Sequence, residues 1–535
     1  MNKNATFFLA IVIFFLAFFY RWGNLNTPFW VDEFSSANQA KIILNHGWGI
    51  FQQKTDIIER NNYITHLIIA LSFKIFGFSE VSARLPLVIA GSLVPVAIFF
   101  LGLTIFNLPT GLIASLLLTF SYFEITWSRQ ARGYVLQQLL AILAFIFYYQ
   151  FIRGLRNKKK VAGFILLFTL VLGLLTHKLF IFVVLGLVLH FIFFYRQKLI
   201  VFLKMFWWLI IFLLFLVIGL EFFLGTFESI FNSIGSGFIS WQNNNTWYYH
   251  SFLWRNYSLI IFLFLLGLFF GYKKHRQFLF LILIFIFFSF SFVNFFFFHY
   301  LSKYLLPIFP FLILIASFAL GEISVLIIRL YWPFSKVKIS FRILNLSLCF
   351  LLVMFIVVNG DQFSLQKKSF YSLNYSFREI ALLDFNQIYA LIKNKISQSD
   401  SEVVIIETWL DRPKWYLGQN YQPLYLFRWI DGGNPHKKTS YYLNNQGEKI
   451  IKAKMQFNFF DEKKSLGLIA EIGDLEKARV KYSQGFLWID DDTLPSEVID
   501  YAKNNLKLEM FVDHFEQDEN PYSKWPAYLY SWGFE

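Results

Sequence analysis

The sequence predicts a helical membrane protein with many spans and one smaller soluble α/β domain at its C-terminal end. Hydrophobic residues make up 57% of the 535 residues and charged residues only 15%, whereas roughly 25% are charged in an ordinary soluble domain. Residues 1–360 hold 27 Lys and Arg but 9 Asp and Glu, while residues 361–535 hold 21 and 25. We therefore expect a transmembrane domain at 1–360 and a soluble domain at 361–535. The excess of basic residues reports membrane topology and not nucleic-acid binding.

Eleven apolar segments are long enough to cross a bilayer as helices, which takes on the order of 20 residues. They lie at 6–21, 84–106, 110–127, 133–152, 161–177, 179–195, 205–224, 257–272, 277–298, 304–328 and 343–359. Arg21 and Trp22 follow the first segment without a small-residue cleavage site, so we expect a span and not a removed signal peptide.

A further apolar segment, Tyr63–Phe78, is expected to be an interfacial helix in the first outer loop. The most basic loop, 153–160, and the N-terminal Lys3 are assigned to the cytoplasm. One span then separates Lys3 from Asp32, and one separates loop 153–160 from Ser128–Arg132, so both Asp32 and Ser128–Arg132 lie outside. An even number of membrane crossings must therefore lie between them. Since 63–78 is the weakest of the three candidates between them, we expect it to lie along the membrane surface. The same count puts the soluble domain on the extracytoplasmic side.

The last 175 residues have the polarity and patterning of a small α/β domain. Glu402–Glu407 has the alternation of a strand, Asp431–Pro435 has turn chemistry, and 378–395 has helical periodicity.

Two adjacent acids, Asp32 and Glu33, follow the first span and are candidates for catalysis. Acids at a membrane boundary are costly unless they are solvated or used. Asp32 could act as a general base, or it could N-cap a helix that runs from Glu33 to His46. The spacing alone leaves both interpretations open.

Basic and aromatic residues gather at the outer end of the third span, in Trp127–Tyr134. Arg129 and Arg132 could anchor a helix end, but cations favour the inner side of a membrane, so two on an outer boundary indicate an anionic partner such as a phosphate. Arg84 is a third candidate, although an i, i+4 pair with Glu80 explains it equally well.

Other polar residues at outer helix ends extend this set. His177 and Lys178 follow one span, and Lys303 precedes another; singly, each is a common interface anchor. Asn62, Thr65, His66 and Ser72 share one face of the helix expected at 63–78. The sequence has no phosphate-binding loop, dinucleotide fingerprint, HExxH or CxxC motif.

The order and spacing of five motifs carry a resemblance to a known family. They are Asp32-Glu33, Asn61-Asn62-Tyr63, Phe76-Gly77-Phe78-Ser79-Glu80 to Ala83-Arg84-Leu85-Pro86, Ser128-Arg129-Gln130-Ala131-Arg132-Gly133-Tyr134, and Lys303-Tyr304-Leu305-Leu306-Pro307. Together they resemble the GT-C glycosyltransferases of the protein O-mannosyltransferase and lipid A aminoarabinose transferase type, and especially their bacterial dolichyl-phosphate-mannose-mannosyltransferase-like relatives. Asn62-Tyr63 stands where the family usually has Pro-Pro, and Lys303 where Arg is usual.

The resemblance implies a GT-C fold and an enzyme that moves a hexosyl or pentosyl group, with inversion, from a polyprenyl-phosphate sugar to a hydroxyl of a lipid, glycan or protein acceptor. It implies that Asp32 is the base and that Glu33 binds or orients the acceptor. The resemblance assigns the donor phosphate to Arg84, Arg129, Arg132 and Lys303, and substrate contacts to His66, Tyr134, His177 and Tyr304. No cofactor is required, although Asp32 and Glu33 could hold a divalent metal.

The alternative is a non-catalytic transporter or binding protein for lipid-linked glycans. A transporter is expected to carry polar residues at mid-span depth along a path, whereas the candidates here map to the outer ends of spans. The sequence therefore favours an enzyme, which we expect in the inner (plasma) membrane of a bacterium, in contact with membrane lipids.

Overall fold

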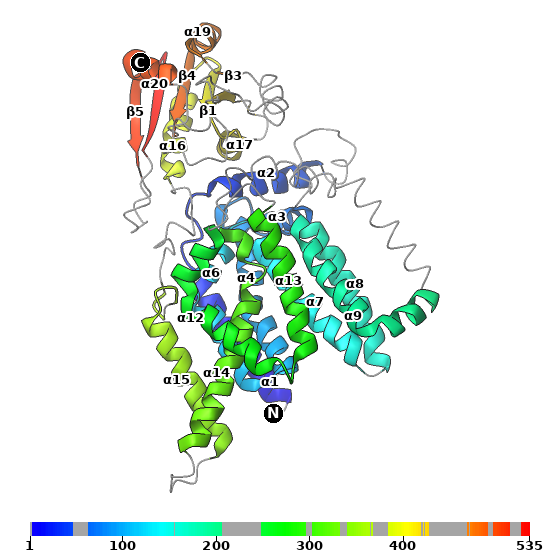
Figure 1. Cartoon of the computed structure of the whole chain (residues 1–535). Coiled ribbons are helices and arrows are strands. Elements are labelled where there is room, and N and C mark those ends of the chain that lie inside the picture. Colours follow the sequence, from blue (N-terminus) through cyan, green and yellow to red (C-terminus); the bar gives the residue numbers. More distant parts are fainter. Residues whose placement is uncertain are drawn as a thin grey trace, which may run out of the picture. The chain divides into compact units, whose positions relative to one another are not determined.

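The computed structural model divides into two compact units that are described separately. The first contains Met1–Leu25 and Phe51–Tyr371, and the second contains Asn26–Ile50 and Ser372–Glu535 (Figure 1). The structure describes residues 3–46, 62–154, 156–205, 248–295, 302–331, 340–363, 365–367, 383–418, 421, 423–426, 468–469, 471–490, 496–513 and 526–534.

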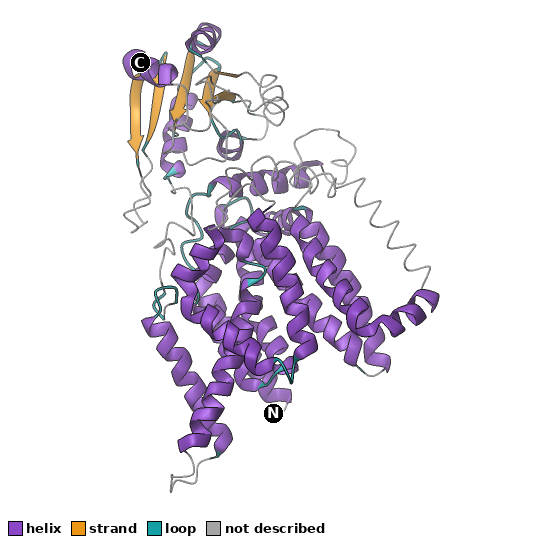
Figure 2. Ribbon diagram, viewed as in Figure 1, coloured by secondary structure: helices purple, strands orange, loops and turns teal. Residues whose placement is uncertain are grey.

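All named secondary-structure elements in the described part of the first unit are helices (Figure 2). Its α-helices are α1 (Lys3–Arg21), α3 (Tyr63–Phe76), α4 (Glu80–Ile105), α5 (Leu108–Phe120), α6 (Tyr122–Ser128), α7 (Tyr134–Arg153), α8 (Arg156–Thr176), α9 (Ile181–Met205), α12 (Tyr248–Gly271), α13 (Arg276–Phe295), α14 (Phe309–Tyr331) and α15 (Phe341–Asn359), with short 3₁₀ turns η2 (Lys178–Phe180) and η4 (Ser302–Leu305). Nine helical segments among the described residues are long and apolar enough to cross a membrane. The molecule is therefore a polytopic helical membrane protein, as the composition predicts.

One predicted span differs in the structure. The segment expected at 110–127 is two short helices, because the backbone at Ser121 is extended, with φ −72° and ψ 122°. Ser121 forms a bridge with Phe363, and the Tyr122 N–H donates to the Gln362 carbonyl at 3.0 Å. Pairing with Phe363, about 240 residues later in the chain, thus breaks the helix within an otherwise apolar segment. The span expected at 205–224 lies outside the described residues.

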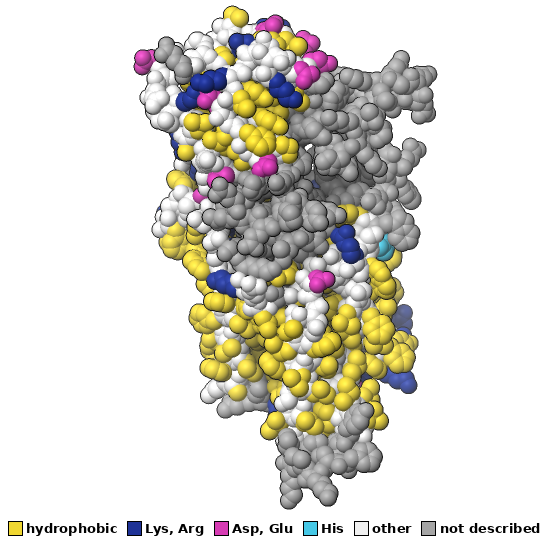
Figure 3. All heavy atoms as spheres, turned by 90° about the vertical axis from the view of Figure 1, so that its left-hand side faces the viewer, with side chains coloured by type: hydrophobic (Ala, Val, Ile, Leu, Met, Phe, Trp, Pro, Cys, Tyr) yellow, Lys and Arg dark blue, Asp and Glu magenta, His cyan; other side chains and the backbone are white. Residues whose placement is uncertain are grey.

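Helix α4 contacts α1, α3, α5 and α7. Its N-cap is Ser79, whose hydroxyl accepts the Ser82 N–H at 3.1 Å. Its contact with α5 depends on two glycines, since a Cβ on Gly102 would lie 2.7 Å from the Gly111 Cα. Such small residues let helices in a membrane approach closely. On the face shown in Figure 3, hydrophobic side chains cover most of the helical bundle, as expected for a surface in contact with lipid.

Helix α3 is apolar but has only 14 residues, or about 21 Å of length. Its polar residues Thr65, His66 and Ser72 are buried, while Leu71 and Ile75 are 57% and 63% exposed. The polar face predicted from the helical wheel is therefore turned toward the protein, against α4 and α8. The Ser72 hydroxyl donates to the Ser82 carbonyl at 2.6 Å.

The second unit contains a six-stranded sheet in the order β3-β2-β1-β4-β6-β5. The strands are β1 (Val403–Glu407), β2 (Leu424–Leu426), β3 (Leu468–Ile469), β4 (Gln484–Ile489), β5 (Lys507–Val512) and β6 (Ala527–Trp532). β1 pairs with β2 and β4 in parallel, and β6 pairs antiparallel with β4 and β5. All five residues of β1 are buried, so this strand is central and covered on both faces rather than half-buried as its alternation suggests.

Among its described residues, the second unit has five helices besides this sheet: α2 (Val31–His46), α16 (Phe385–Ser397), α17 (Asp411–Leu417), α19 (Ile472–Lys481) and α20 (Ser496–Asn505). The strand and the helical patch expected near 378–395 are thus present, as β1 and α16, whereas the turn expected at 431–435 lies outside the described residues. The domain is a small α/β unit, as predicted.

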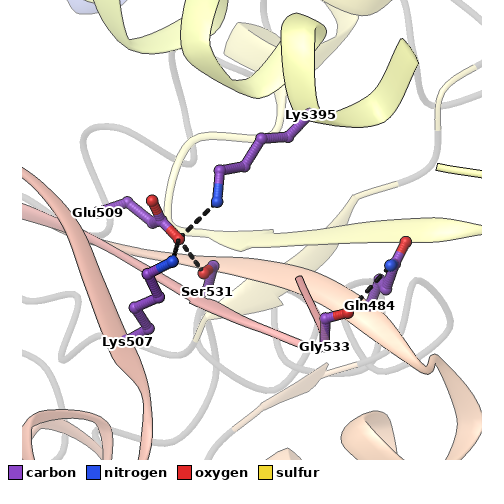
Figure 4. A network of polar contacts seen from close by, with 6 residues as sticks. All are labelled: Lys395, Gln484, Lys507, Glu509, Ser531 and Gly533. Atoms are coloured by element: carbon purple, nitrogen blue, oxygen red, sulfur yellow. Dashed lines mark hydrogen bonds and ion pairs between the residues drawn. The ribbon is translucent and has the colours of Figure 1, made fainter. Parts of the chain in front are cut away.

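A polar network joins α16 to the antiparallel end of the sheet (Figure 4). The Glu509 carboxylate accepts hydrogen bonds from Lys395 at 2.7 Å and from the Ser531 hydroxyl at 2.6 Å, and Lys507 lies 3.7 Å away. Glu509 sits at the register shift between Leu508 and Met510. Burial opposes the shift, but the hydrogen bonds from Lys395 and Ser531 and the charges of Lys395 and Lys507 together lower the pKa of Glu509. The bulge therefore directs a carboxylate toward α16.

Candidate active site

Four predicted residues from three distant segments of the first unit lie together. The Tyr134 ring is 5.2 Å from the His177 ring and 5.9 Å from the Tyr304 ring, measured between centroids. The Lys303 Nζ lies 5.3 Å from the centre of the Tyr134 ring and 5.6 Å from that of Tyr304. All four side chains are at least nine-tenths buried. We call this group, with Arg132, the cation–aromatic cluster.

The backbone around Gly133 fixes one side of the cluster. Gly133 precedes the first residue of α7, which is Tyr134. A Cβ at Gly133 would lie 2.5 Å from the Thr65 hydroxyl and 3.4 Å from the Thr176 carbonyl. Only glycine leaves room for α3 and the end of α8 to approach this turn, so the predicted Gly133-Tyr134 motif acts through packing as well as through its aromatic ring.

The orientation of the His177 ring is set by its own backbone turn. The side chain caps η2, with Nδ1 accepting the Leu179 N–H at 3.2 Å. Because Nδ1 accepts, the neutral ring carries its proton on Nε2, which is then the nitrogen that can donate. The cations near enough to act on this ring are Lys178, Arg132 and Lys303. His177 is therefore a hydrogen-bond donor among positive charges.

The cations of the cluster are suited to an anionic ligand. Arg132 is 8% exposed and Lys303 is 3% exposed. A guanidinium offers phosphate oxygens a planar fork of donors, and an ammonium offers them a point charge. Aromatic rings next to them can stack on a sugar or contact a prenyl chain.

The other two predicted phosphate residues hold the segment that follows α1. The Arg84 Nη1 donates to the Leu25 carbonyl at 2.8 Å, and the Arg129 Nη2 donates to the Gly23 carbonyl. Gly23 has a φ of +144°, a conformation that favours glycine. Both arginines therefore have a structural function in holding the start of the first loop.

The two acids begin helix α2, which belongs to the second unit. The helix starts at Val31, so Asp32 lies within its first turn and not at the N-cap, which was one of the two roles left open for it. The Glu33 carboxylate accepts the Trp30 N–H at 2.9 Å, and Glu33 is 1% exposed. This contact is half of a capping box. Asp32 is only partly buried, so it is the more accessible of the two carboxylates.

The structure thus groups Arg132, Tyr134, His177, Lys303 and Tyr304. His66 is buried on α3, next to Thr65, which faces Gly133. Within the described part of the chain, no group of three or more His, Cys, Asp or Glu side chains could hold a metal ion.

A buried network behind the cluster was not found from the sequence. The Gln138 Nε2 donates to the Glu124 carboxylate at 2.8 Å and to the Leu306 carbonyl at 2.7 Å. Arg21, which is fully buried, donates through Nε to the Ser128 hydroxyl at 3.0 Å. Gln138 thereby fixes the backbone after Tyr304, and Arg21 fixes the end of α6 before Arg129. The only sequence signals for this network were three polar side chains, those of Glu124, Gln138 and Arg21, within otherwise apolar segments.

Fold and site together define a polytopic membrane protein with a buried cation–aromatic cluster and a small α/β domain. Residues 63–220 match the family model described as dolichyl-phosphate-mannose-protein mannosyltransferase. None of the curated protein sequences matches the chain.

Solved structures extend the comparison over the whole chain. ArnT from Cupriavidus metallidurans in the apo state has a TM-score of 0.62 at 10% identity, over 99% of this chain and 98% of ArnT. ArnT from the same organism bound to undecaprenyl phosphate has a TM-score of 0.58 at 10% identity, over 98% and 97%. An Archaeoglobus fulgidus oligosaccharyltransferase in complex with Zn and sulfate has a TM-score of 0.43 at 12% identity, over 76% of this chain and 61% of that one. The chain has the fold of ArnT, and the GT-C fold expected from the motifs is confirmed.

Proposed function

We propose that this protein is an integral membrane glycosyltransferase that transfers a sugar, with inversion, from a polyprenyl-phosphate donor to the hydroxyl of a lipid, glycan or protein acceptor. The observation that carries the proposal is the cation–aromatic cluster, in which Arg132, His177 and Lys303 converge beside two tyrosines. It is found in a chain that has the fold of ArnT over nearly its whole length, and the ArnT structure bound to undecaprenyl phosphate supports the donor class.

In this proposal Asp32 is the general base. It takes the proton of the acceptor hydroxyl while the acceptor oxygen forms a bond to the anomeric carbon, C1, of the donor sugar. The bond from C1 to the phosphate oxygen breaks, and its electron pair goes to the leaving polyprenyl phosphate. Attack from the face opposite the leaving group inverts the configuration at C1. The transition state has oxocarbenium character, by analogy with glycoside hydrolysis.

The cluster stabilises the charge that develops on the leaving group. The phosphate gains about one negative charge in this step, so fixed cations lower the energy of the transition state more than that of the bound donor. Arg132 and Lys303 are assigned to the phosphate, and His177, Tyr134 and Tyr304 to the phosphate and sugar. Arg84 on α4 and Arg129 after α6 are also assigned to the donor phosphate, and His66 to substrate contact.

Glu33 has a more indirect function than the sequence suggests. Its carboxylate accepts the Trp30 N–H, so it holds the first turn of α2 and orients the acceptor side of the site through Asp32. We place this reaction on the extracytoplasmic side of a bacterial inner membrane, where nucleotide sugars are absent and lipid-linked donors are required.

The experiment uses purified full-length protein with a panel of polyprenyl-phosphate sugars, and release of polyprenyl phosphate is the signal. One donor is expected to turn over in the wild type, with no measurable turnover for Asp32→Asn and unchanged donor binding. Asp361→Asn is the matched control, because Asp361 is an exposed aspartate outside the site, and it should turn over normally.

Two results would contradict the proposal. Normal turnover by Asp32→Asn removes Asp32 as the base. Donor binding by the wild type without release, even when crude membrane acceptors are added, favours a transporter or binding protein for lipid-linked glycans.

A further inference from the structure

One face of α2 packs against the C-terminal α/β domain. Phe34, Ala37 and Asn38 are buried, and Lys41 continues the same face at the i, i+3, i+4, i+7 spacing of a helical stripe. The Phe34 ring lies 5.8 Å from that of Phe385 on α16. The helix whose first turn carries Asp32 and Glu33 therefore belongs structurally to a domain that starts more than 330 residues later in the chain.

Two polar contacts attach α2 to α17. The Asn38 Nδ2 donates to the Asp411 carbonyl at 2.7 Å. The Lys41 Nζ donates to the Trp415 carbonyl at 3.1 Å and lies 3.5 Å from the centre of the Trp415 ring. Both acceptors are backbone groups of one short helix, so the contacts set the position of α2 along α17 as well as its rotation.

Helix α17 is itself fixed by a buried ion pair. Arg412 is 1% exposed, and its Nη2 lies 2.6 Å from the Asp490 carboxylate and its Nη1 3.8 Å from the Glu407 carboxylate. Its guanidinium also lies over the Phe385 ring at 4.5 Å. Glu407 ends β1, and Asp490 follows β4, the two central strands. Displacing α17 would separate the buried Arg412 charge from Asp490, which is strongly unfavourable.

We propose that α17 is a positioning element for the reaction: through Asn38 and Lys41 it fixes the direction of α2 and therefore the place of Asp32. This inference rests on the proposed function, because Asp32 matters as the base only if sugar transfer occurs. Nine helical steps separate Asp32 from Lys41 and span about 13 Å of helix. A tilt of about 5° at Lys41 moves Asp32 by about 1 Å, a displacement that can cost a hundredfold in rate.

The first test compares the same substitution at two asparagines of α2. Asn38 is buried and bonded to α17, whereas Asn45, two turns further along, is exposed. Asn38→Ala and Lys41→Met are each expected to lower kcat about tenfold without changing KM for the donor, because the donor site lies in other segments. Asn45→Ala should match the wild type, and Lys41→Arg should restore most of the rate.

The second test reports the position of α2 without any turnover. Spin labels are placed at Asn45→Cys and Lys477→Cys in a Cys349→Ser background, since Cys349 is the sole cysteine and the Lys477 side chain is 81% exposed. A narrow distance distribution is expected, and the Asn38→Ala, Lys41→Met double variant should broaden it.

The outcomes of these tests distinguish failure of the positioning proposal from failure of the proposed function. A distribution that stays narrow in the double variant overturns the attachment of α2 by these contacts. Broadening with an unchanged kcat overturns the positioning role. If the wild type turns over no donor, the proposed function fails, while the label distances still decide whether α17 holds α2.

Discussion

The Arg21 guanidinium donates to the Ser128 hydroxyl at 3.0 Å, although 107 residues separate them. Two further bonds reach the Ala17 and Leu118 carbonyls, each at 3.2 Å. A single fully buried cation thus joins the end of α1 to α5 and to α6, and α6 leads directly into the loop that carries Arg129 and Arg132.

Replacing Arg21 with methionine should destabilise the membrane unit. The three buried acceptors lose their donor, so we expect a loss of about 2–4 kcal/mol in the free energy of unfolding. Thermal unfolding of the detergent-solubilised protein measures this loss. The control is Arg153→Met, because Arg153 is exposed at the end of α7 and donates to the Tyr149 hydroxyl of the preceding turn at 2.7 Å. Equal melting temperatures for the two variants would contradict this account of Arg21.

Gly91 should not tolerate even one methyl group. A Cβ there would lie 2.4 Å from the Ser128 Cβ and 3.3 Å from the Arg21 Nε, and overpacking of this kind costs about 1–3 kcal/mol. Gly91→Ala is therefore expected to lower the melting temperature. Gly321→Ala serves as the matched helical control, since its Cβ would meet only Thr110, at an ordinary 3.6 Å, and it should be neutral or slightly stabilising.

Lys303→Met should slow sugar transfer about a hundredfold, which corresponds to about 3 kcal/mol of transition-state stabilisation. The Lys303 ammonium lies in the cluster beside Tyr134 and Tyr304, so its loss removes charge where the leaving phosphate develops it. Lys303→Arg keeps the charge and should retain much of the rate. Steady-state kinetics decide the matter, with Lys74→Met, an exposed lysine on α3, as the control. A rate for Lys303→Met equal to that of the control would remove Lys303 from the donor site.

Glu407→Gln should stabilise the C-terminal domain increasingly as pH rises. Burial raises the pKa of Glu407 from 4.5 to about 8, against the opposing effect of Arg412. The stabilising effect of that bound proton is complete below the unfolded-state pKa of about 4.5 and is lost as pH rises through about 8. A glutamine does not titrate, so the variant gains on the wild type by up to about 1.4 kcal/mol per pH unit between these values.

Hydrogen exchange of the β4 amides, compared between variant and wild type at the same pH, measures the Glu407 effect. Slower exchange in the variant is expected at pH 8 and little difference at pH 5. The exposed Glu402, just before β1, supplies the control variant Glu402→Gln. A difference that shrinks with rising pH would show that Glu407 is ionised in the folded domain.

The helices could be predicted from the sequence because long apolar runs at 84–106 and 133–152 leave a chain in lipid no alternative to helix. The break at Ser121 could not, because it depends on pairing with Phe363. The α/β character of the tail was visible in local patterns, whereas the membership of α2 in that unit depends on contacts with α17, which no local pattern encodes.

The candidate site likewise contains residues that local sequence patterns predict and residues whose role depends on distant contacts. Tyr134 and Lys303 were predicted from the order of the motifs, and His177 from its place at an outer helix end. Arg21 was missed, since a cation at the end of a span is indistinguishable from an interface anchor until Gly91 and Ser128 close around it. The capping contact of Glu33 was missed because its N-cap residue is Trp30, a residue type that offers no capping side chain.

The bond between Asn38 and Asp411 spans 373 residues of chain, and this has a consequence for biosynthesis. At roughly 5–20 residues per second, a ribosome makes α2 about 20–75 s before it makes α17. During that interval the early helix has no partner in its own unit, although the membrane spans between them can already insert. A nascent or prematurely terminated chain should therefore be inserted in the membrane but inactive. Activity would begin only when α17 has been synthesised and has packed against α2.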